Sequence, residues 1–176
     1  MHLNPYGAEP VKLATRLVNA QPNSAEEIAR ICDEEGLIVD RPVVAADHGE
    51  IVQFLEHWCE IADADASDSD GEETRAALTN ALLAQYSGHP RLSNHDGWHL
   101  HYRDDDVTFA RMVQTVIIVG TALHLTSRGM DRIGRCASVS CSNVFADTTR
   151  NGRQRFCSTR CNNRDAQRRF REGRRK

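Results

Sequence analysis

The chain of 176 residues is long enough for one ordinary hydrophobic core and a small additional domain. Its composition, with 40% hydrophobic and 27% charged residues, is typical of a globular protein and excludes a fibrous or disordered chain. Residues 1–20 lack the basic start, apolar core and cleavage site of a secretory signal peptide, so we expect a cytoplasmic protein.

The net charge of −3 conceals two segments of opposite sign. Residues 128–176 hold 14 of the 22 basic residues and 4 of the 25 acidic ones, a balance of +10. Residues 1–127 hold the remaining 8 basic and 21 acidic residues, a balance of −13. This asymmetry predicts an acidic body followed by a basic tail that meets an anionic partner.

Two helices are predicted in the first third of the chain. Ser24 and Glu27 form a capping-box pattern at the start of one helix, and Gly36 is suited to end it. In that helix Cys32 falls on the core face as a small apolar residue. The second helix, over residues 47–63, carries its apolar residues on one stripe: Ile51, Phe54, Leu55, Trp58, Cys59 and Ile61.

An acidic segment with a glycine, residues 62–73, predicts a solvent-exposed loop. Its carboxylates do not follow the order of an EF-hand loop, which argues against calcium binding there. A third helix is predicted over residues 72–85.

Residues 90–103 predict a β-hairpin, since Asp96-Gly97 is a favoured tight turn and the residues after it alternate in polarity. His99 and His101 would share one face of a strand, so shared metal ligation is geometrically possible. No third ligand can be assigned from the sequence. An exposed polar face explains the pattern equally well, and the sequence favours that interpretation.

The longest uncharged stretch, residues 112–127, predicts a buried core helix over residues 107–125. The stretch is shorter than the ~18–20 residues that span a bilayer and contains polar side chains, so we expect no membrane association. The carboxylates of residues 104–106 would cap the start of this helix, and Gly129 would end it.

Four of the six cysteines lie close together near the C-terminus, in the spacing Cys136-x4-Cys141, fifteen residues, Cys157-x3-Cys161. Each close pair can supply two thiolates to a tetrahedral zinc ion. Two disulfides or a redox pair are the alternatives. A reducing cytosol argues against disulfides, and the spacing differs from the Cys-x-x-Cys of a redox site.

The fifteen-residue spacer has the composition of a hairpin, with a turn at Asn151-Gly152 and apolar residues on either side. The second cysteine pair opens a helix that Ser158 can cap. Together these elements predict a small treble-clef-like finger. We expect one structural zinc ion, with no coordination position left open for catalysis and with Cys136, Cys141, Cys157 and Cys161 as its ligands.

A series of residues surrounds these cysteines: Phe145-x-Asp147, Thr149-Arg150-Asn151, Arg155-x-Cys157-Ser158 and Cys161-Asn162-Asn163-Arg164. It resembles the signature of the CGNR zinc-finger family, with Asn162 in the place of that family's glycine. The resemblance implies an N-terminal ABATE domain whose proposed role is stress-induced transcription regulation. Residues 13–20 and 25–37 are similar to that domain more loosely.

Arginines crowd the segment after the second cysteine pair. On a helix, five of them fall within an arc of about 80°, with Ala166 and Phe170 on another face and available to pack inward. A guanidinium stripe of one sign suits phosphate recognition. Arg150 and Arg153, near the predicted turn, could reach a groove of the nucleic acid. The stripe consists of Arg160, Arg164, Arg168, Arg171 and Arg175.

These observations predict an α+β protein that is mainly α: a helical domain with a β-hairpin over residues 1–128, then a zinc finger with a basic helix over residues 129–176. We expect it to bind nucleic acid, with duplex DNA preferred, as a transcription regulator whose first domain serves sensing or association. The sequence is also compatible with a homodimer. The alternative is a protein-interaction adaptor with a zinc-stabilised basic tail. No nucleophile–base pair, phosphate loop or open metal site can be assigned, so no enzymatic activity is expected.

Overall fold

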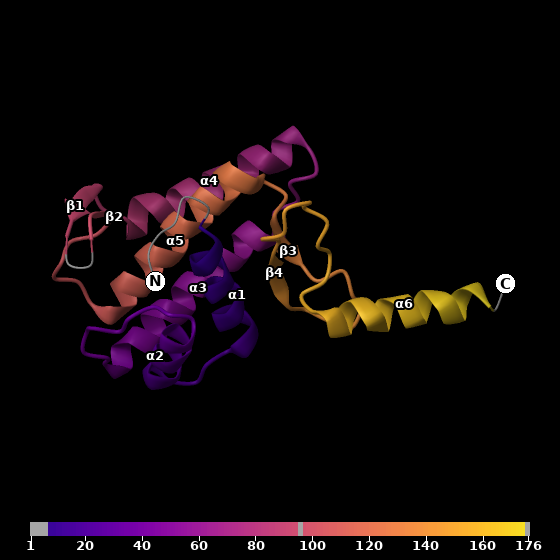
Figure 1. Ribbon diagram of the computed structural model, residues 1–176, viewed down its shortest axis with the longest axis horizontal. Helices are drawn as coiled ribbons and strands as arrows, with labels where there is room; N and C mark the ends of the chain where they lie inside the picture. The colour runs from indigo at the N-terminus through magenta and orange to yellow at the C-terminus, as the bar shows by residue number, and fades with distance from the viewer. Residues whose placement is uncertain (1–6, 95–96, 175–176) are drawn as a thin grey trace.

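The computed structural model of the protein describes residues 7–94 and 97–174. Five helices form a body, a first hairpin lies at one end of it, and a second hairpin with the last helix lies at the other end (Figure 1). Both hairpins are antiparallel and two-stranded. The elements are α1 (Ala8–Ala20), α2 (Ala25–Glu34), α3 (Ala45–Asp63), α4 (Ser69–Tyr86), β1 (Arg91–Ser93), β2 (His99–His101), α5 (Phe109–Arg128), β3 (Ile133–Arg135), β4 (Val144–Ala146) and α6 (Thr159–Gly173). The expected mainly helical α+β fold is confirmed.

The predicted helices are present, with shifted boundaries. Helix α2 begins after Ser24, whose hydroxyl accepts a hydrogen bond from the Glu27 amide at 3.2 Å, as the capping pattern predicts. Helices α3 and α4 begin two and three residues before their expected starts at residues 47 and 72. For α4 the cause is Asp68, whose carboxylate accepts from the Gly71 amide and caps the helix inside the expected loop.

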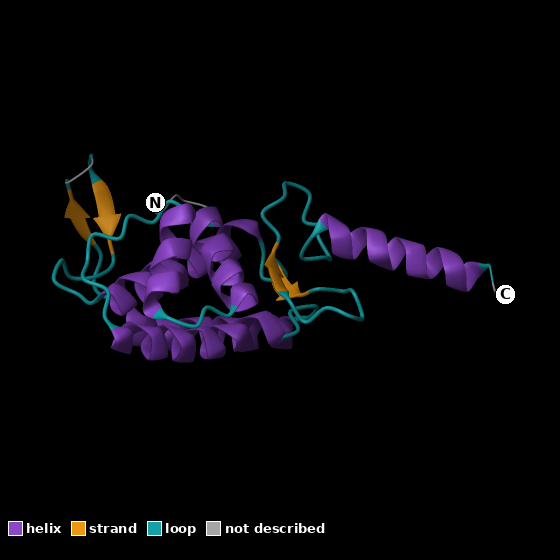
Figure 2. Cartoon of the chain, turned by 90° about the horizontal axis from the view of Figure 1, so that it is seen from below, coloured by secondary structure: helices purple, strands orange, loops and turns teal. Residues whose placement is uncertain are grey.

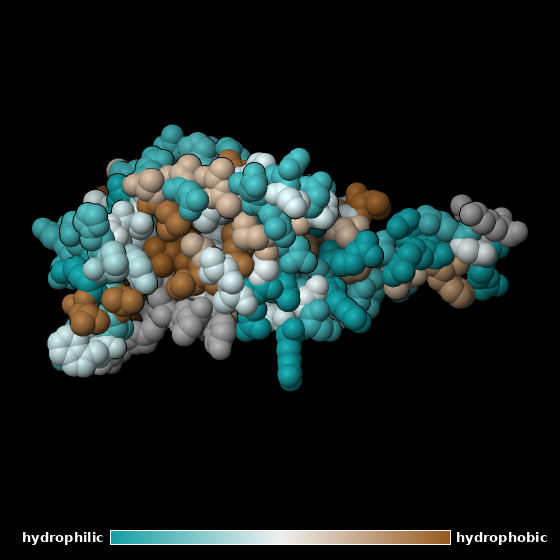
Figure 3. Space-filling model, turned by 90° about the horizontal axis from the view of Figure 1, so that it is seen from above, coloured by the Kyte–Doolittle hydropathy of each residue, from teal (hydrophilic) through white to brown (hydrophobic). Residues whose placement is uncertain are grey.

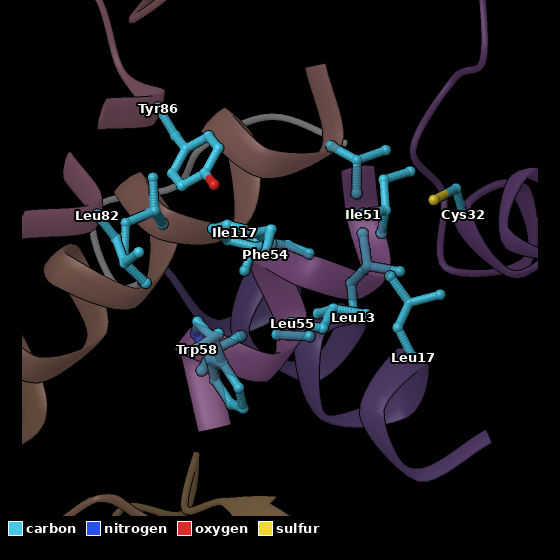
Figure 4. Packing of buried hydrophobic residues seen from close by; sticks show 14 of the residues in the cluster. Leu13, Leu17, Cys32, Ile51, Phe54, Leu55, Trp58, Leu82, Tyr86 and Ile117 are labelled. Atoms are coloured by element: carbon cyan, nitrogen blue, oxygen red, sulfur yellow. The ribbon is translucent and has the colours of Figure 1, made fainter. Parts of the chain in front are cut away.

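Helix α5 is the central element of the body and packs against α1, α3 and α4. It is long and apolar enough to cross a membrane by length and composition, but most of it is buried among the other helices. The indole N–H of Trp58 donates to the Thr121 hydroxyl at 2.9 Å, so the largest core side chain of α3 is satisfied inside the protein. Figure 4 shows Trp58, Phe54 and Ile117 among the packed apolar side chains of this core.

Helices α1 and α5 approach closely at one point. A Cβ atom on Gly120 would lie 2.3 Å from the Cβ of Pro10, so only glycine allows the two helices this contact.

A buried carboxylate joins the starts of α3 and α5. Asp47 is only 2% exposed; it accepts from the Val44 amide at 2.8 Å and from the Ala110 amide at 3.1 Å. Thr108 is the N-cap of α5 and accepts from the Arg111 amide. The expectation that the acidic run at residues 104–106 caps this helix is therefore wrong, because the run ends before the cap.

The first hairpin has the opposite polarity from the one expected. His99 and His101 lie on the half-buried face, and the exposed face carries apolar side chains. The exposed fractions are 69% for Leu92, 74% for Trp98 and 45% for Leu100. On the histidine face, Asp105 of the following loop lies 3.6 Å from the Nδ1 atom of His101 and forms an ion pair with Arg91 of β1. The predicted turn lies partly outside the described residues, since Asp96 is not among them.

The second hairpin is fixed to the helical body. Its residues Ile133, Val144 and Ala146 are buried as part of the body's hydrophobic core. The side-chain amide of Asn19, at the end of α1, donates to the Val144 carbonyl and accepts from the Val144 N–H, both at 2.9 Å. Asn19 thereby acts as a neighbouring strand would and holds β4 against α1.

Two arginines add further contacts between the body and the second hairpin. Arg135 of β3 forms a bidentate pair with Asp63 at the end of α3, with N–O distances of 2.6 and 2.9 Å. Arg75 is 2% exposed and donates to the carbonyls of Ala64 and Met130. It therefore ties the end of α3 to the segment that leads into β3.

Candidate metal centre

The two cysteine pairs converge on one point beside the second hairpin. Cys136 directly follows β3 and its amide donates to Asn143, while Cys141 closes a turn by donating to Ser138. Cys157 precedes α6, and Cys161 lies in the first turn of that helix. Their four sulfur atoms all lie within 4.8 Å of one another.

The sulfur geometry suits tetrahedral zinc. The Cys157 Sγ atom lies 3.7 Å from the Sγ atoms of both Cys141 and Cys161. Four thiolates around zinc with bonds of about 2.3 Å place neighbouring sulfurs about 3.8 Å apart. A disulfide needs a separation of about 2.05 Å, and the cysteines are indeed free. The four cysteines therefore form a closed site for one structural zinc ion, as expected from the spacing.

Helix α6 contributes to the electrostatics of this site. The Ser158 hydroxyl caps the helix by accepting from the Cys161 amide at 3.3 Å, and the same hydroxyl lowers the pKa of the Cys161 thiol to about 7. Burial instead raises the pKa of Cys157 to about 12. The Cys157 amide points at the Cys136 sulfur, 3.4 Å away. A zinc ion would supply the positive charge that keeps the Cys157 thiol deprotonated.

Asp147 organises the long loop between the two cysteine pairs. It is 2% exposed, and it accepts from the amides of Thr149 at 2.8 Å and Gln154 at 2.9 Å. Burial favours its neutral form, but these hydrogen bonds and Arg132 hold the pKa of the carboxyl below its usual range. Gly152 has a φ of 63°, and a Cβ atom there would lie 2.4 Å from the Arg132 guanidinium carbon. The loop is thus built around one carboxylate.

The prediction of a hairpin within this spacer is wrong, because its strand pairs with a strand outside the spacer. Strand β4 pairs with β3, which precedes the first cysteine, and Gly134 lies opposite Phe145. The residues around Phe156 form no strand; Arg155 accepts a hydrogen bond from the Ala137 amide instead. The cause is Asp147, whose hydrogen bonds with the amides of Thr149 and Gln154 stabilise a loop directly after β4.

The arginines expected to bind nucleic acid are mostly exposed. Helix α6 projects from the finger away from the body and is hydrophilic over most of its surface (Figures 2 and 3). Arg160, Arg164 and Arg171 are exposed on it, with Arg164 donating to the Ser140 hydroxyl at 3.0 Å. Arg150 and Arg153 are exposed in the loop that Asp147 holds.

Two members of the arginine stripe differ from the rest. Arg168 is paired with Asp165 at 2.8 Å and with Glu172 at 2.9 Å, so its charge is compensated within the helix. Arg175 lies outside the described residues. The inward packing proposed for Phe170 is wrong, because its side chain is 66% exposed on the projecting helix, which has no body element beside it.

Sequence reasoning missed the residues that fix the finger in place. Asn19, Asp63 and Arg75 all belong to the helical body, and each contacts the segment between residues 130 and 144. No local pattern marks an amide at the end of a helix as the partner of a strand 125 residues later. The one signal in the sequence was that Asn19 is a polar residue at the end of a helix whose neighbouring positions are apolar.

Comparison with known proteins agrees with this geometry. A search among curated proteins gave no match. Residues 132–175 match the family described as CGNR zinc finger, and the match spans β3, both cysteine pairs and α6. It does not extend into the helical body, so the similarity of that part to the ABATE domain stays a prediction. The C-terminal quarter of the chain, with its four-cysteine zinc site, is therefore similar to the zinc fingers of the CGNR family.

Proposed function

We propose that the protein binds duplex DNA through its zinc finger and helix α6, and that it acts in the cytoplasm as a transcription regulator, without catalysing a reaction. The helical body would serve sensing or association. The observation that carries the proposal is the projection of α6: a basic helix, exposed at most of its positions, begins at the four-cysteine site and points away from the acidic body.

The charges of the projecting helix support an anionic partner. Between Thr159 and Gly173 the chain has five arginines and two acidic residues, and both acidic residues pair with arginines inside the helix. Arg160, Arg164 and Arg171 lie within an arc of about 40° on one side. A planar guanidinium donates two hydrogen bonds to one phosphate, so this edge suits a nucleic-acid backbone.

The loop around Asp147 offers a second set of contacts. Arg150 and Arg153 are exposed there, and the hydrogen bonds of Asp147 fix the backbone that carries them. Side chains on a fixed loop beside a phosphate-binding helix are suited to base contacts in a groove. We expect these two arginines to influence sequence preference more than overall affinity.

The adaptor function remains the alternative, and one observation favours it. Phe170 is 66% exposed on the projecting helix, with the Arg174 guanidinium carbon 5.7 Å from its ring centroid. An exposed aromatic residue among arginines is also typical of a protein-binding surface. An acidic partner protein would then take the place of DNA.

Salt dependence of binding distinguishes these two functions. Each neutralised phosphate contributes about −0.9 to the slope of log affinity against log salt, so three to five arginine contacts predict a slope of about −3 to −5. Changing Arg160, Arg164 and Arg171 together to Gln should reduce the slope by about 2 to 3 and leave the zinc content unchanged. Changing the exposed Arg30 of the body to Gln serves as the matched control and should alter neither.

The decisive measurement is fluorescence anisotropy of labelled duplex DNA and RNA with the zinc-loaded protein over a series of salt concentrations. Binding to neither nucleic acid, or binding with no salt dependence, would reject the proposal. Capture of a partner protein that survives nuclease treatment would then favour the adaptor function.

A further inference from the structure

Helix α6 has two sides that differ in their charge. On one side Asp165 forms ion pairs with Arg168 at 2.8 Å and with Arg169 at 2.9 Å. Glu172 pairs with Arg168 at 2.9 Å on the same side. Both acidic residues of the helix are therefore engaged there, and the arginines on the other side keep their positive charge.

A row of uncharged side chains runs beside those arginines. Asn163, Gln167 and Phe170 are four and three residues apart, so they share one face of the helix within an arc of about 60°. We call them the amide–aromatic row. All three are exposed, Phe170 by 66%, and neither amide side chain is hydrogen-bonded to a described residue. Arg160 and Arg171 lie about 20° and 40° from Gln167 around the helix.

The row is accessible from outside the protein. Within the described part of the chain, Cys161 and Asp165 are the buried residues of α6, and neither belongs to the row. The helix projects from the finger with no element of the body beside it (Figures 1 and 2). The major groove of B-DNA is about 12 Å wide and admits one α-helix. One side of α6 can therefore enter such a groove.

The side chains of the row match the base edges of the major groove. The amide of Asn or Gln accepts from the adenine amino group and donates to the adenine N7 atom, and a Phe ring contacts the thymine methyl group. All three side chains therefore favour A·T pairs. The neighbouring arginines donate to phosphates, which carry no sequence information.

The spacing of the row sets the number of base pairs it can reach. From Asn163 to Phe170 the helix rises by about 10 Å, which corresponds to about three base-pair steps of 3.4 Å. The Arg174 guanidinium carbon lies 5.7 Å from the Phe170 ring centroid. This cation–π contact orients the ring and adds a positive charge at the end of the row.

We propose that Asn163, Gln167 and Phe170 read an A·T-rich segment of about three base pairs in the major groove of duplex DNA. The inference rests on the proposed function, because it requires that α6 binds duplex DNA. The two amides recognise adenines, and the ring recognises a thymine methyl group. Arg160 and Arg171 hold the helix in the groove through phosphates.

Selection from a pool of duplexes with a randomised core, using the full-length zinc-loaded protein, tests this proposal. The unmodified protein should enrich adjacent A·T pairs. Anisotropy competition against the same duplex with one pair changed to G·C then measures the discrimination at that pair. Gln167→Ala should reduce it by roughly 5- to 150-fold at one pair, and Phe170→Ala should reduce it at another pair nearby. Alanine favours helix, so unfolding of α6 would not explain the loss.

Two controls separate base reading from general binding. Asn163→Ala should relax the preference, whereas Asn162→Ala should not, because Asn162 is equally exposed but lies about 100° away around the helix. Arg171→Gln should weaken binding to every sequence and reduce the salt slope by about 1, with the preference unchanged. Zinc content should stay the same in all variants.

The outcomes distinguish this inference from the proposed function. Absence of duplex binding by the unmodified protein would overturn both. Salt-dependent binding without sequence preference would overturn this inference alone, as would a preference that survives in the Gln167 and Phe170 variants. A preference lost only when Arg150 and Arg153 are changed would assign base reading to the loop and would also overturn it.

Discussion

The helical body and the zinc finger are stabilised by different interactions. The body buries large apolar side chains from five helices, including Phe54, Trp58 and Phe109 with no exposed surface. The finger buries Ile133 and Val144, both in its hairpin, and beyond β4 it relies on the cysteines and on the Asp147 loop. A segment of this size cannot build a sufficient apolar core, so metal binding supplies the folding free energy.

The hairpin β3–β4 belongs to both regions. Its cysteine-bearing ends reach the metal site, while its buried side chains and the Asn19 contacts join it to α1. The finger therefore has two parts that are stabilised in different ways. The part nearest the body has apolar support, and the part that carries Cys157, Cys161 and α6 depends on the metal.

The largest expected effect is the loss of a zinc ligand. Cys157→Ser should abolish zinc binding, because a thiolate ligand is lost and structural zinc sites contribute on the order of 10 kcal/mol to folding. Hydrogen exchange should then show lost protection across the Asp147 loop and α6, while α1–α5 stay protected. Cys32→Ser in the body should leave the zinc content unchanged.

The result also tests how independent the two regions are. Equal loss of protection in α3 and α5 of the Cys157 variant would show that the metal organises the core as well. Retained protection in α6 without zinc would show that the helix needs no metal. Either result would contradict the division drawn above.

A smaller effect is expected from the core of the body. Trp58→Ala removes a fully buried indole and leaves the Thr121 hydroxyl without its donor, so the free energy of unfolding should fall by about 3–5 kcal/mol. Urea unfolding measures this change. The neighbouring exposed His57→Ala should change it by less than about 0.5 kcal/mol. Zinc content should stay the same in both variants. Zinc loss in the folded Trp58 variant would contradict the claim that the body and the finger are stabilised by different interactions.

The sequence predicted those features that depend on local patterns. The helical stripe from Ile51 to Ile61, the Ser24 cap and the four-cysteine site follow from spacing alone, and the structure contains them. Thiol pairs separated by three or four residues suffice to predict a metal site because the metal, and not the rest of the fold, sets their geometry.

Features that depend on distant partners could not be predicted. The face of β2 that turns inward is set by Arg91 and Asp105, which lie outside the strand, and the alternating pattern alone fits either face. Strand β4 was expected to pair within the spacer, whereas β3 lies before the first cysteine. The hydrogen bond from the Ala110 amide, in the first turn of α5, to Asp47 joins residues 63 positions apart. In each case the outcome depends on residues outside the segment whose pattern was read.

The contact between the two regions gives the last and smallest prediction. Asn19→Ala leaves the N–H and C=O of Val144 without their partner at a half-buried position, so stability should fall by about 1–3 kcal/mol. Asp63→Asn is the matched control at the same interface. Its side chain is 51% exposed, and an exposed ion pair contributes about 0–1 kcal/mol. The amide of Val144 should therefore exchange faster in the Asn19 variant than in the Asp63 variant, with zinc bound in both. The opposite order would mean that Arg135, and not the amide of α1, holds the finger against the body, and that the orientation of α6 depends on a salt-sensitive contact.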